Sequence, residues 1–192
     1  MVLSNTVEPE TSLVEQAKKG DRNAFGELVR RHYQGVVRVV TRMCGDTRLA
    51  EDATQEAFIR AWVNLPTFHA QAPLQSWLYR IAINAALDSL RNCREEPLED
   101  AEVQIASEPA EDPEAVLIEK EQAAVLQQAM KSLPEAARAV LVLREYGGLS
   151  YQEIAGVLDI PVGTVMSRLN YARSRLREKY ASIMTRTESQ YA

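Results

Sequence analysis

Residues 148–168 have the pattern of two short helices joined by a tight turn. Ser150 and Glu153 stand in the register of a capping box, in which each side chain satisfies a backbone N–H near the other, so a helix should begin at Tyr151. Two residues after that helix, Pro161 suits the first turn of a second one. The pattern predicts a helix-turn-helix.

The second helix of this motif would carry two contrasting faces. At 100° per residue its apolar residues fall on one stripe, which should pack inward. The opposite crest is polar and uncharged, and arginines flank it on both sides, as suits a helix that lies in the major groove of DNA. An ordinary helical hairpin with a solvated arginine face is the alternative. The expected contacts to duplex DNA are Thr164, Ser167, Arg168, Asn170, Tyr171, Arg173 and Arg175.

The net charge of −5 looks unfavourable for a protein that binds nucleic acid, until it is divided along the chain. Residues 1–94 carry a balance of +2 and residues 122–192 a balance of +3, whereas residues 95–121 carry −10. Residues 95–112 also contain prolines and little apolar content, so we expect a flexible acidic linker between two mildly basic domains.

Other function classes find little support in the sequence. No apolar run is long enough to span a membrane, and the acidic residues around Glu8 and Glu10 do not form a signal-peptide pattern, so we expect a cytoplasmic protein without direct membrane insertion. Cys44 and Cys93 lie far apart, which disfavours a disulfide or a zinc site. No phosphate loop or nucleophile pattern appears. We therefore expect no catalytic residues, metal, cofactor or small-molecule substrate.

The remaining sequence predicts helices throughout and no strands, hence an all-α fold of two small helical domains. Ser12 and Glu15 suggest a capping box for a short first helix, and Asp21 can cap the next. The second helix should bury Phe25, Leu28, Val29, Tyr33, Val36, Val37 and Val40. Further helices are expected at about 47–65, 73–94, 113–132 and 134–146, which gives a first domain at 1–94 and a second at 113–192.

The segment 68–80 gathers aromatic, amide and arginine side chains at the junction of two expected helices. Such a set suits unpaired bases, which stack on aromatic rings and hydrogen-bond to amides while guanidinium groups hold the phosphates. Taken alone, the segment is better explained by packing, because a tryptophan at helical spacing usually belongs to a core.

Two runs of residues resemble a known family. Residues 52–62 (DATQEAFIRAW) and 76–84 (SWLYRIAIN) resemble region 2 of the extracytoplasmic-function sigma factors of bacterial RNA polymerase, and residues 133–168 resemble their region 4. Both blocks occur in the family's order, separated by a linker, so the resemblance covers most of the chain. It implies a sigma factor that directs promoter-specific initiation of transcription.

The resemblance also implies roles for individual residues. A polymerase face of Asp52, Gln55, Glu56 and Ile59 would dock on the clamp helices of core RNA polymerase. A minus-10 group would capture a flipped base of the non-template strand. A minus-35 group, the seven residues already named on the helix-turn-helix, would read duplex promoter DNA. The minus-10 group consists of Phe68, His69, Gln71, Ser76, Trp77, Arg80 and Asn84.

Family membership further implies a membrane-linked anti-sigma factor that covers these faces. Relatives often have Phe-Arg-Gly where this chain has Phe68-His69-Ala70, and often have basic residues where it has Met166 and Tyr171. The promoter sequence therefore does not carry over from the family. A stand-alone helix-turn-helix regulator remains the alternative, although it leaves residues 52–84 unexplained, and an enzyme with a fused DNA-binding tail lacks catalytic residues.

Overall fold

The computed structural model describes residues 8–69, 72–95 and 113–190, and the side chains of 94–95, 113–121 and 183–190 are left aside. Every regular element in these ranges is helical, which confirms the all-α prediction. The predicted linker at 95–112 lies outside the described residues, apart from the last residue of one helix. Among the described residues, no helix is both long and apolar enough to cross a membrane.

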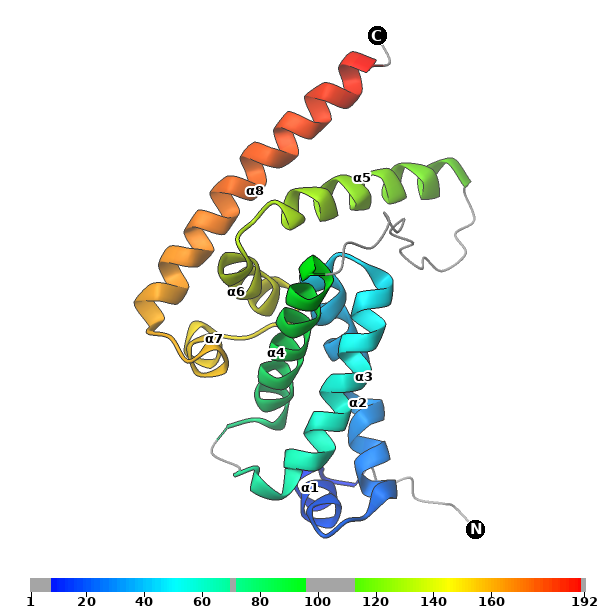
Figure 1. The fold of residues 1–192 in the computed structure, drawn as a ribbon, viewed down its shortest axis with the longest axis vertical. Coiled ribbons are helices and arrows are strands. Elements are labelled where there is room, and N and C mark those ends of the chain that lie inside the picture. The colour runs from blue at the N-terminus through cyan, green and yellow to red at the C-terminus, as the bar shows by residue number, and fades with distance from the viewer. Residues whose placement is uncertain (1–7, 70–71, 96–112, 191–192) are drawn as a thin grey trace.

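The first half of the chain folds into four α-helices and one short 3-10 helix (Figure 1). Alanines dominate the buried face of the third helix, so its neighbours approach closely, and the buried valines of the second helix pack beside it. The elements are α1 (Glu10–Lys18), α2 (Arg22–Cys44), α3 (Thr47–Asn64), η1 (Leu65–Thr67) and α4 (Leu74–Glu95).

The ends of α2 form as the sequence predicts. The Asp21 side chain accepts hydrogen bonds from the backbone N–H groups of Asn23 and Ala24 and so caps the N-terminus. Gly45 ends the helix with φ +69°, a left-handed conformation that glycine adopts without steric strain. The packing face is rotated from the predicted one, because Val39 is fully buried while Tyr33 is 46% exposed.

The predicted capping box at the first helix is wrong. The helix begins at Glu10, two residues before the expected cap, and Pro9 occupies the N-cap position without a side-chain hydrogen bond. Ser12 lies inside the helix, and its hydroxyl donates to the Glu8 carboxylate at 2.7 Å. The apolar residues Leu13, Val14 and Ala17 are buried in either register, so packing rather than capping fixes where this helix lies.

The second half of the chain contains the predicted helix-turn-helix. Ser150 and Glu153 form both bonds of the capping box, and Asp159 adopts φ 53° at the turn, after which Pro161 precedes the second helix rather than entering it. The elements are α5 (Pro113–Lys131), α6 (Glu135–Glu145), α7 (Tyr151–Leu158) and α8 (Val162–Gln190).

Packing of the helix-turn-helix follows the predicted apolar stripe. Val165, Leu169 and Ala172 of α8 are buried against α6 and α7. On α7 the buried residues are Ile154 and Val157, whereas Leu158 is only half-buried. These contacts leave the polar crest of α8 free to face outward.

The two halves of the chain also pack against each other, which the sequence pattern did not predict. Helix α6 lies against the C-terminal part of α2, and α7 lies against α4 (Figure 1). The buried residues of both halves form one continuous hydrophobic cluster. The described arrangement is therefore closed, with the helix-turn-helix resting on the first group of helices.

Candidate functional site

The predicted polymerase face lies on one exposed side of α3. Asp52, Gln55, Glu56 and Ile59 are all exposed, and Ile59 retains 59% of its accessible surface. Their spacing of three and four residues places them on adjacent turns of one helical face. The structure thus brings these four side chains together as a carboxylate and amide surface with an apolar residue at one end.

An ion-pair chain borders this face. Glu56 accepts a hydrogen bond from Arg60 at 2.7 Å, and Arg60 also donates to Asp88 of α4 at 2.8 Å. The hydrogen bonds to Asp88 and then Glu56 raise the pKa of the Arg60 guanidinium. Of the four face residues, Glu56 is thus partly neutralised, which leaves Asp52 as the carboxylate more available to a basic partner.

The minus-10 group divides into buried and exposed members. Phe68 is 5% exposed and packs against the ring of Trp77, with ring centroids 5.0 Å apart. Ser76 is 4% exposed, and its hydroxyl has no hydrogen-bond partner among the described residues. Phe68 therefore packs against the first turn of α4, where the Ser76 hydroxyl is also buried.

His69, Arg80 and Asn84 are the exposed members of this group. Arg80 and Asn84 are four residues apart on α4 and project from the same face. Gln71 lies outside the described residues. Arg80 and Asn84 therefore offer a guanidinium and an amide on one exposed face of α4, and no contact joins His69 to them among the described residues.

The minus-35 group lies on the outer face of α8. Ser167, Asn170, Tyr171, Arg173 and Arg175 are exposed, and Thr164 and Arg168 are half-buried. Sequence reasoning left out two exposed apolar side chains on the first turns of this helix, Val162 at 37% and Met166 at 49% exposure. Apolar side chains at such positions can contact the methyl group of thymine. The i, i+4 spacing of these two residues, beside the polar crest and off the buried stripe, was the available signal in the sequence.

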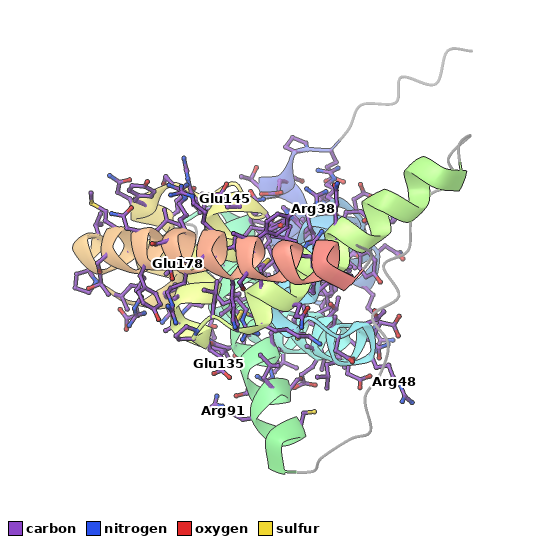
Figure 2. All side chains as sticks on the ribbon, turned by 90° about the horizontal axis from the view of Figure 1, so that it is seen from above. Arg38, Arg48, Arg91, Glu135, Glu145 and Glu178 are labelled. Carbon is purple, nitrogen blue, oxygen red and sulfur yellow. The ribbon has the colours of Figure 1, made fainter. Side chains whose placement is uncertain are left out.

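Two arginines of this group have carboxylate partners. Arg173 donates to Glu145 of α6 at 2.7 Å, and Arg175 donates to Glu178 at 3.1 Å. Figure 2 labels both carboxylates beside α8. The hydrogen bond to Glu145 raises the pKa of Arg173. Because both pairs are exposed to solvent, each contributes little to stability, and the two guanidinium groups stay accessible to other anions.

A cleft of about 230 Å³ lies between members of the minus-10 group and members of the minus-35 group. Arg80 and Asn84 of α4 line one side, and Asp159 and Arg168 of the helix-turn-helix line the other. Members of the minus-10 and minus-35 groups therefore share one cleft between the two halves of the chain.

Comparison with known families gives two matches along the chain. A family model described as Sigma-70 region 2 matches residues 28–95, and one described as Sigma-70, region 4 matches residues 123–176. The first match contains the polymerase face and the minus-10 group, and the second contains the helix-turn-helix. The predicted linker falls between them.

Curated relatives match nearly the whole chain. The RNA polymerase sigma-H factor of Pseudomonas aeruginosa is 38% identical over 89% of this chain and 93% of its own length. The ECF RNA polymerase sigma-E factor of Escherichia coli K12 is 38% identical over 91% of this chain and 95% of its own. The ECF RNA polymerase sigma factor SigW of Bacillus subtilis is 37% identical over 86% and 94%, respectively.

A solved structure of CnrH in complex with the cytosolic domain of CnrY resembles this fold with a TM-score of 0.69. The two chains are 26% identical, and the alignment covers 90% of this chain and 97% of CnrH. The similarity therefore includes helices from both halves of the molecule.

Proposed function

This chain belongs to the extracytoplasmic-function sigma factors of bacterial RNA polymerase. We propose that α3 binds core polymerase, that α4 binds the minus-10 element of the promoter and that α8 binds the minus-35 element. The family consists of sigma factors, which act by binding core polymerase and directing initiation at specific promoters, and are not enzymes. The observation that carries the assignment is the position of the three residue groups. Each lies within the family match to which its role belongs.

On α3, the polymerase face would bind a basic helix of core polymerase. Asp52 and Gln55 offer a carboxylate and an amide, and Ile59 adds exposed apolar surface at the end of the same face. Charge complementarity of this kind speeds association and fixes the register of two surfaces.

On α4 and its preceding loop, the minus-10 group would hold an unstacked base. Unstacking a base costs a few kcal/mol, which stacking and hydrogen bonds in a pocket can offset. The exposed Arg80 and Asn84 suit the phosphate and the base edge, while the buried Phe68 would shape the loop from below. Base capture would make strand separation and sequence reading a single event.

On α8, the first turns would enter the major groove at the minus-35 element. Ser167 and Asn170 project outward with small polar groups that fit base edges, and Arg173 and Arg175 flank them for phosphates. Each domain alone would bind DNA weakly. Attachment of both domains to one polymerase raises their effective concentration at the promoter.

A stand-alone helix-turn-helix regulator is not favoured. Such a regulator would use the second domain to bind DNA. That function does not explain why residues 28–95 match Sigma-70 region 2, or why α3 carries an exposed polar face.

Regulation by an anti-sigma factor forms part of the proposal. The similarity to CnrH, which was solved with the cytosolic domain of a second protein, supports a protein partner for this chain as well. We propose that this anti-sigma factor is membrane-linked and that the sigma factor itself acts in the cytoplasm. Exposed apolar residues such as Ile59 and Met166 would be buried by the partner.

Binding to sigma-free core polymerase tests the function directly. The native chain should comigrate with core polymerase on gel filtration, and the double variant Asp52→Lys, Gln55→Lys should bind at least about tenfold more weakly because it places like charges against a basic helix. Gln128→Lys, on the exposed side of α5, is the matched control and should bind normally. Failure of the folded, partner-free native chain to bind would contradict the proposal.

A further inference from the structure

The first domain contains a second cavity, between α1 and the residues that precede α4, which we call the α1 pocket. Its volume is about 370 Å³. Helix α1 lies against η1 here, as Figure 1 shows. The pocket is lined by Glu10, Thr11, Val14, Glu15, Phe68 and residues 72–74. Members of the minus-10 group therefore border two different cavities, since Phe68 lines the α1 pocket while Arg80 and Asn84 line the cleft beside the helix-turn-helix.

Buried apolar side chains form part of the wall of the α1 pocket. Val14 of α1 is 6% exposed, Phe68 is 5% exposed and Leu74 of α4 is 4% exposed. Apolar and aromatic surfaces of this kind pack well against the flat face of an unpaired base. The volume lies near the lower end of the range for small-ligand pockets, roughly 300–1,000 Å³. The pocket thus suits a single base better than a larger molecule.

Polar side chains of α1 stand beside this apolar wall. Thr11 and Glu15 are exposed and lie four residues apart, on one face of the helix. Glu15 does not serve in the expected capping box, and it accepts instead a long hydrogen bond from Lys18 at 3.5 Å while its side chain stays 66% exposed. Glu10, by contrast, is bonded to His32 of α2 at 2.7 Å. Because an exposed ion pair is weak, Glu15 is the carboxylate more available to a ligand.

Lys18 places a positive charge at the same site. Its ammonium group lies 5.9 Å from the centre of the Phe68 ring, within reach of a cation–π interaction. Lys19, the next residue, is exposed. A nucleotide needs an apolar surface for its base, a polar partner for the base edge and a cation for its phosphate. The α1 pocket and Lys18 together offer all three.

We propose that the α1 pocket binds one unpaired base of the displaced promoter strand, separate from the base at Arg80 and Asn84, and that Glu15 selects a base with an exocyclic amino group. A carboxylate accepts a hydrogen bond from the amino group of cytosine, whereas thymine and uracil present a carbonyl oxygen there. Lys18 holds the adjoining phosphate. The inference rests on the proposed function, because only a protein that opens promoter DNA meets such a strand.

A comparison of dC with dU tests the role of Glu15. These bases have the same size, and a fork template that leaves the tested strand unpaired removes any effect of base pairing. Each unpaired position in turn carries dC or dU, and competition binding to the complex of core polymerase with this chain gives the ratio of the two affinities. The native chain should favour dC about tenfold at one position.

Glu15→Gln should bring this ratio close to one, because an amide can either accept or donate a hydrogen bond. Glu51→Gln, which changes an exposed carboxylate on α3 outside the pocket, is the matched control and should keep the native ratio. Both substitutions keep the size of the side chain and lie on exposed helix positions, so both variants should fold.

Lys18→Gln tests the phosphate contact separately. It should weaken binding of the dC and dU templates alike, and it should reduce the slope of log affinity against log salt concentration by about 0.7. The preference for dC should stay as in the native chain. An unchanged slope would overturn the role assigned to Lys18.

A ratio near one at every position in the native complex would overturn the inference, as would a native preference that Glu15→Gln leaves unchanged. Weaker binding of core polymerase by Glu15→Gln, with no change in base preference, would also overturn it, because the pocket would then hold a basic side chain of the polymerase. Binding of the native chain to core polymerase separates these results from failure of the proposed function. Without that binding, both proposals fail.

Discussion

Two buried hydroxyl groups in the first domain have no hydrogen-bond partner among the described residues. Ser76 lies in the first turn of α4 and Thr54 on the packed face of α3, at 4% and 3% exposure, respectively. An unpaired buried hydroxyl costs free energy on folding. Because Ser76 belongs to the minus-10 group, its hydroxyl has a candidate partner in a captured base, whereas Thr54 has none.

We predict that Ser76→Ala raises the free energy of unfolding by roughly 0.5–1 kcal/mol, because the unpaired hydroxyl is removed, while it lowers open-complex formation several-fold. Thr54→Val is the matched control and should raise stability similarly without affecting promoter opening. Urea unfolding and open-complex lifetimes on one promoter measure the two effects. Equal open-complex lifetimes for Ser76→Ala and the native chain would remove Ser76 from the minus-10 group.

The sequence indicated which residues are exposed on helices better than it indicated the role of aromatic residues. The family resemblance assigned Asp52, Gln55 and Ile59 to one face of a helix, and all three are exposed. Phe68 was assigned to base capture by the family resemblance, yet it is buried against Trp77. Periodicity does not distinguish an aromatic ring that packs beneath a loop from one that lies on it, since both positions favour the same residues.

At the level of elements, helix ends with a defined chemical pattern were predicted well. Asp21, Gly45 and the pair of Ser150 and Glu153 act as expected. The capping box expected at Ser12 does not form, because a capping pattern is weaker than the burial of an apolar face. Helix ends thus follow local chemistry only where packing permits the same register.

The capping box at α7 makes stability depend on pH. Hydrogen bonds from the Ser150 hydroxyl and then its backbone N–H lower the pKa of Glu153, so the ionised carboxylate stabilises the fold. This contribution is present above the ordinary glutamate pKa and is lost as the pH falls through the lowered value. We predict that Ser150→Ala costs about 1 kcal/mol at pH 7 and that the difference from the native chain shrinks below about pH 4.

Urea unfolding of both proteins between pH 3 and pH 7 would measure this dependence. Ser132→Ala, whose hydroxyl bonds a helix carbonyl without an acidic partner, is the control, and its effect should not vary with pH in this way. A constant difference between Ser150→Ala and the native chain across that range would contradict the assigned role of Glu153.

The glycine at the end of α2 reports on the interface between the halves. Gly45 and Gly148 share φ +69°, so an alanine at either position is strained by about 1 kcal/mol. A Cβ at Gly45 would also lie 2.7 Å from the Gln127 amide nitrogen and 3.0 Å from Lys131 Cγ, whereas a Cβ at Gly148 would meet no described atom within 4 Å beyond its own chain neighbours.

We predict that Gly45→Ala lowers the free energy of unfolding by about 1 kcal/mol more than Gly148→Ala does, because it also displaces Gln127, whose side-chain carbonyl accepts a hydrogen bond from Arg42 at 3.2 Å. Chemical denaturation measures the free energy of unfolding of both variants. Because the two variants share the same backbone strain, the difference between their free energies reports the contact between the halves. Equal losses of stability would show that the contact between the halves contributes nothing at this point.

At the scale of the whole molecule, the sequence predicted the helices of both halves of the chain but not the contact between the halves. The charge of residues 95–121 suggested two independent domains, a division that stays a prediction. The residues that join the halves by hydrogen bonds, Arg42, Gln127 and Arg138, are polar and lie on helices whose apolar faces already have partners. No periodic pattern marks such residues, since single hydrogen bonds across a long sequence separation leave no local trace.

The central claim is that this chain directs core polymerase to promoters with two separate elements. Transcription in vitro from a library with randomised upstream sequence, with core polymerase and the native chain, tests it most directly. The account predicts transcripts only with both proteins present, enriched for two sequence elements about 25 base pairs apart, and loss of this enrichment with Asp52→Lys, Gln55→Lys. Transcription without enriched elements, or tight sequence-specific binding by the chain alone, would contradict it.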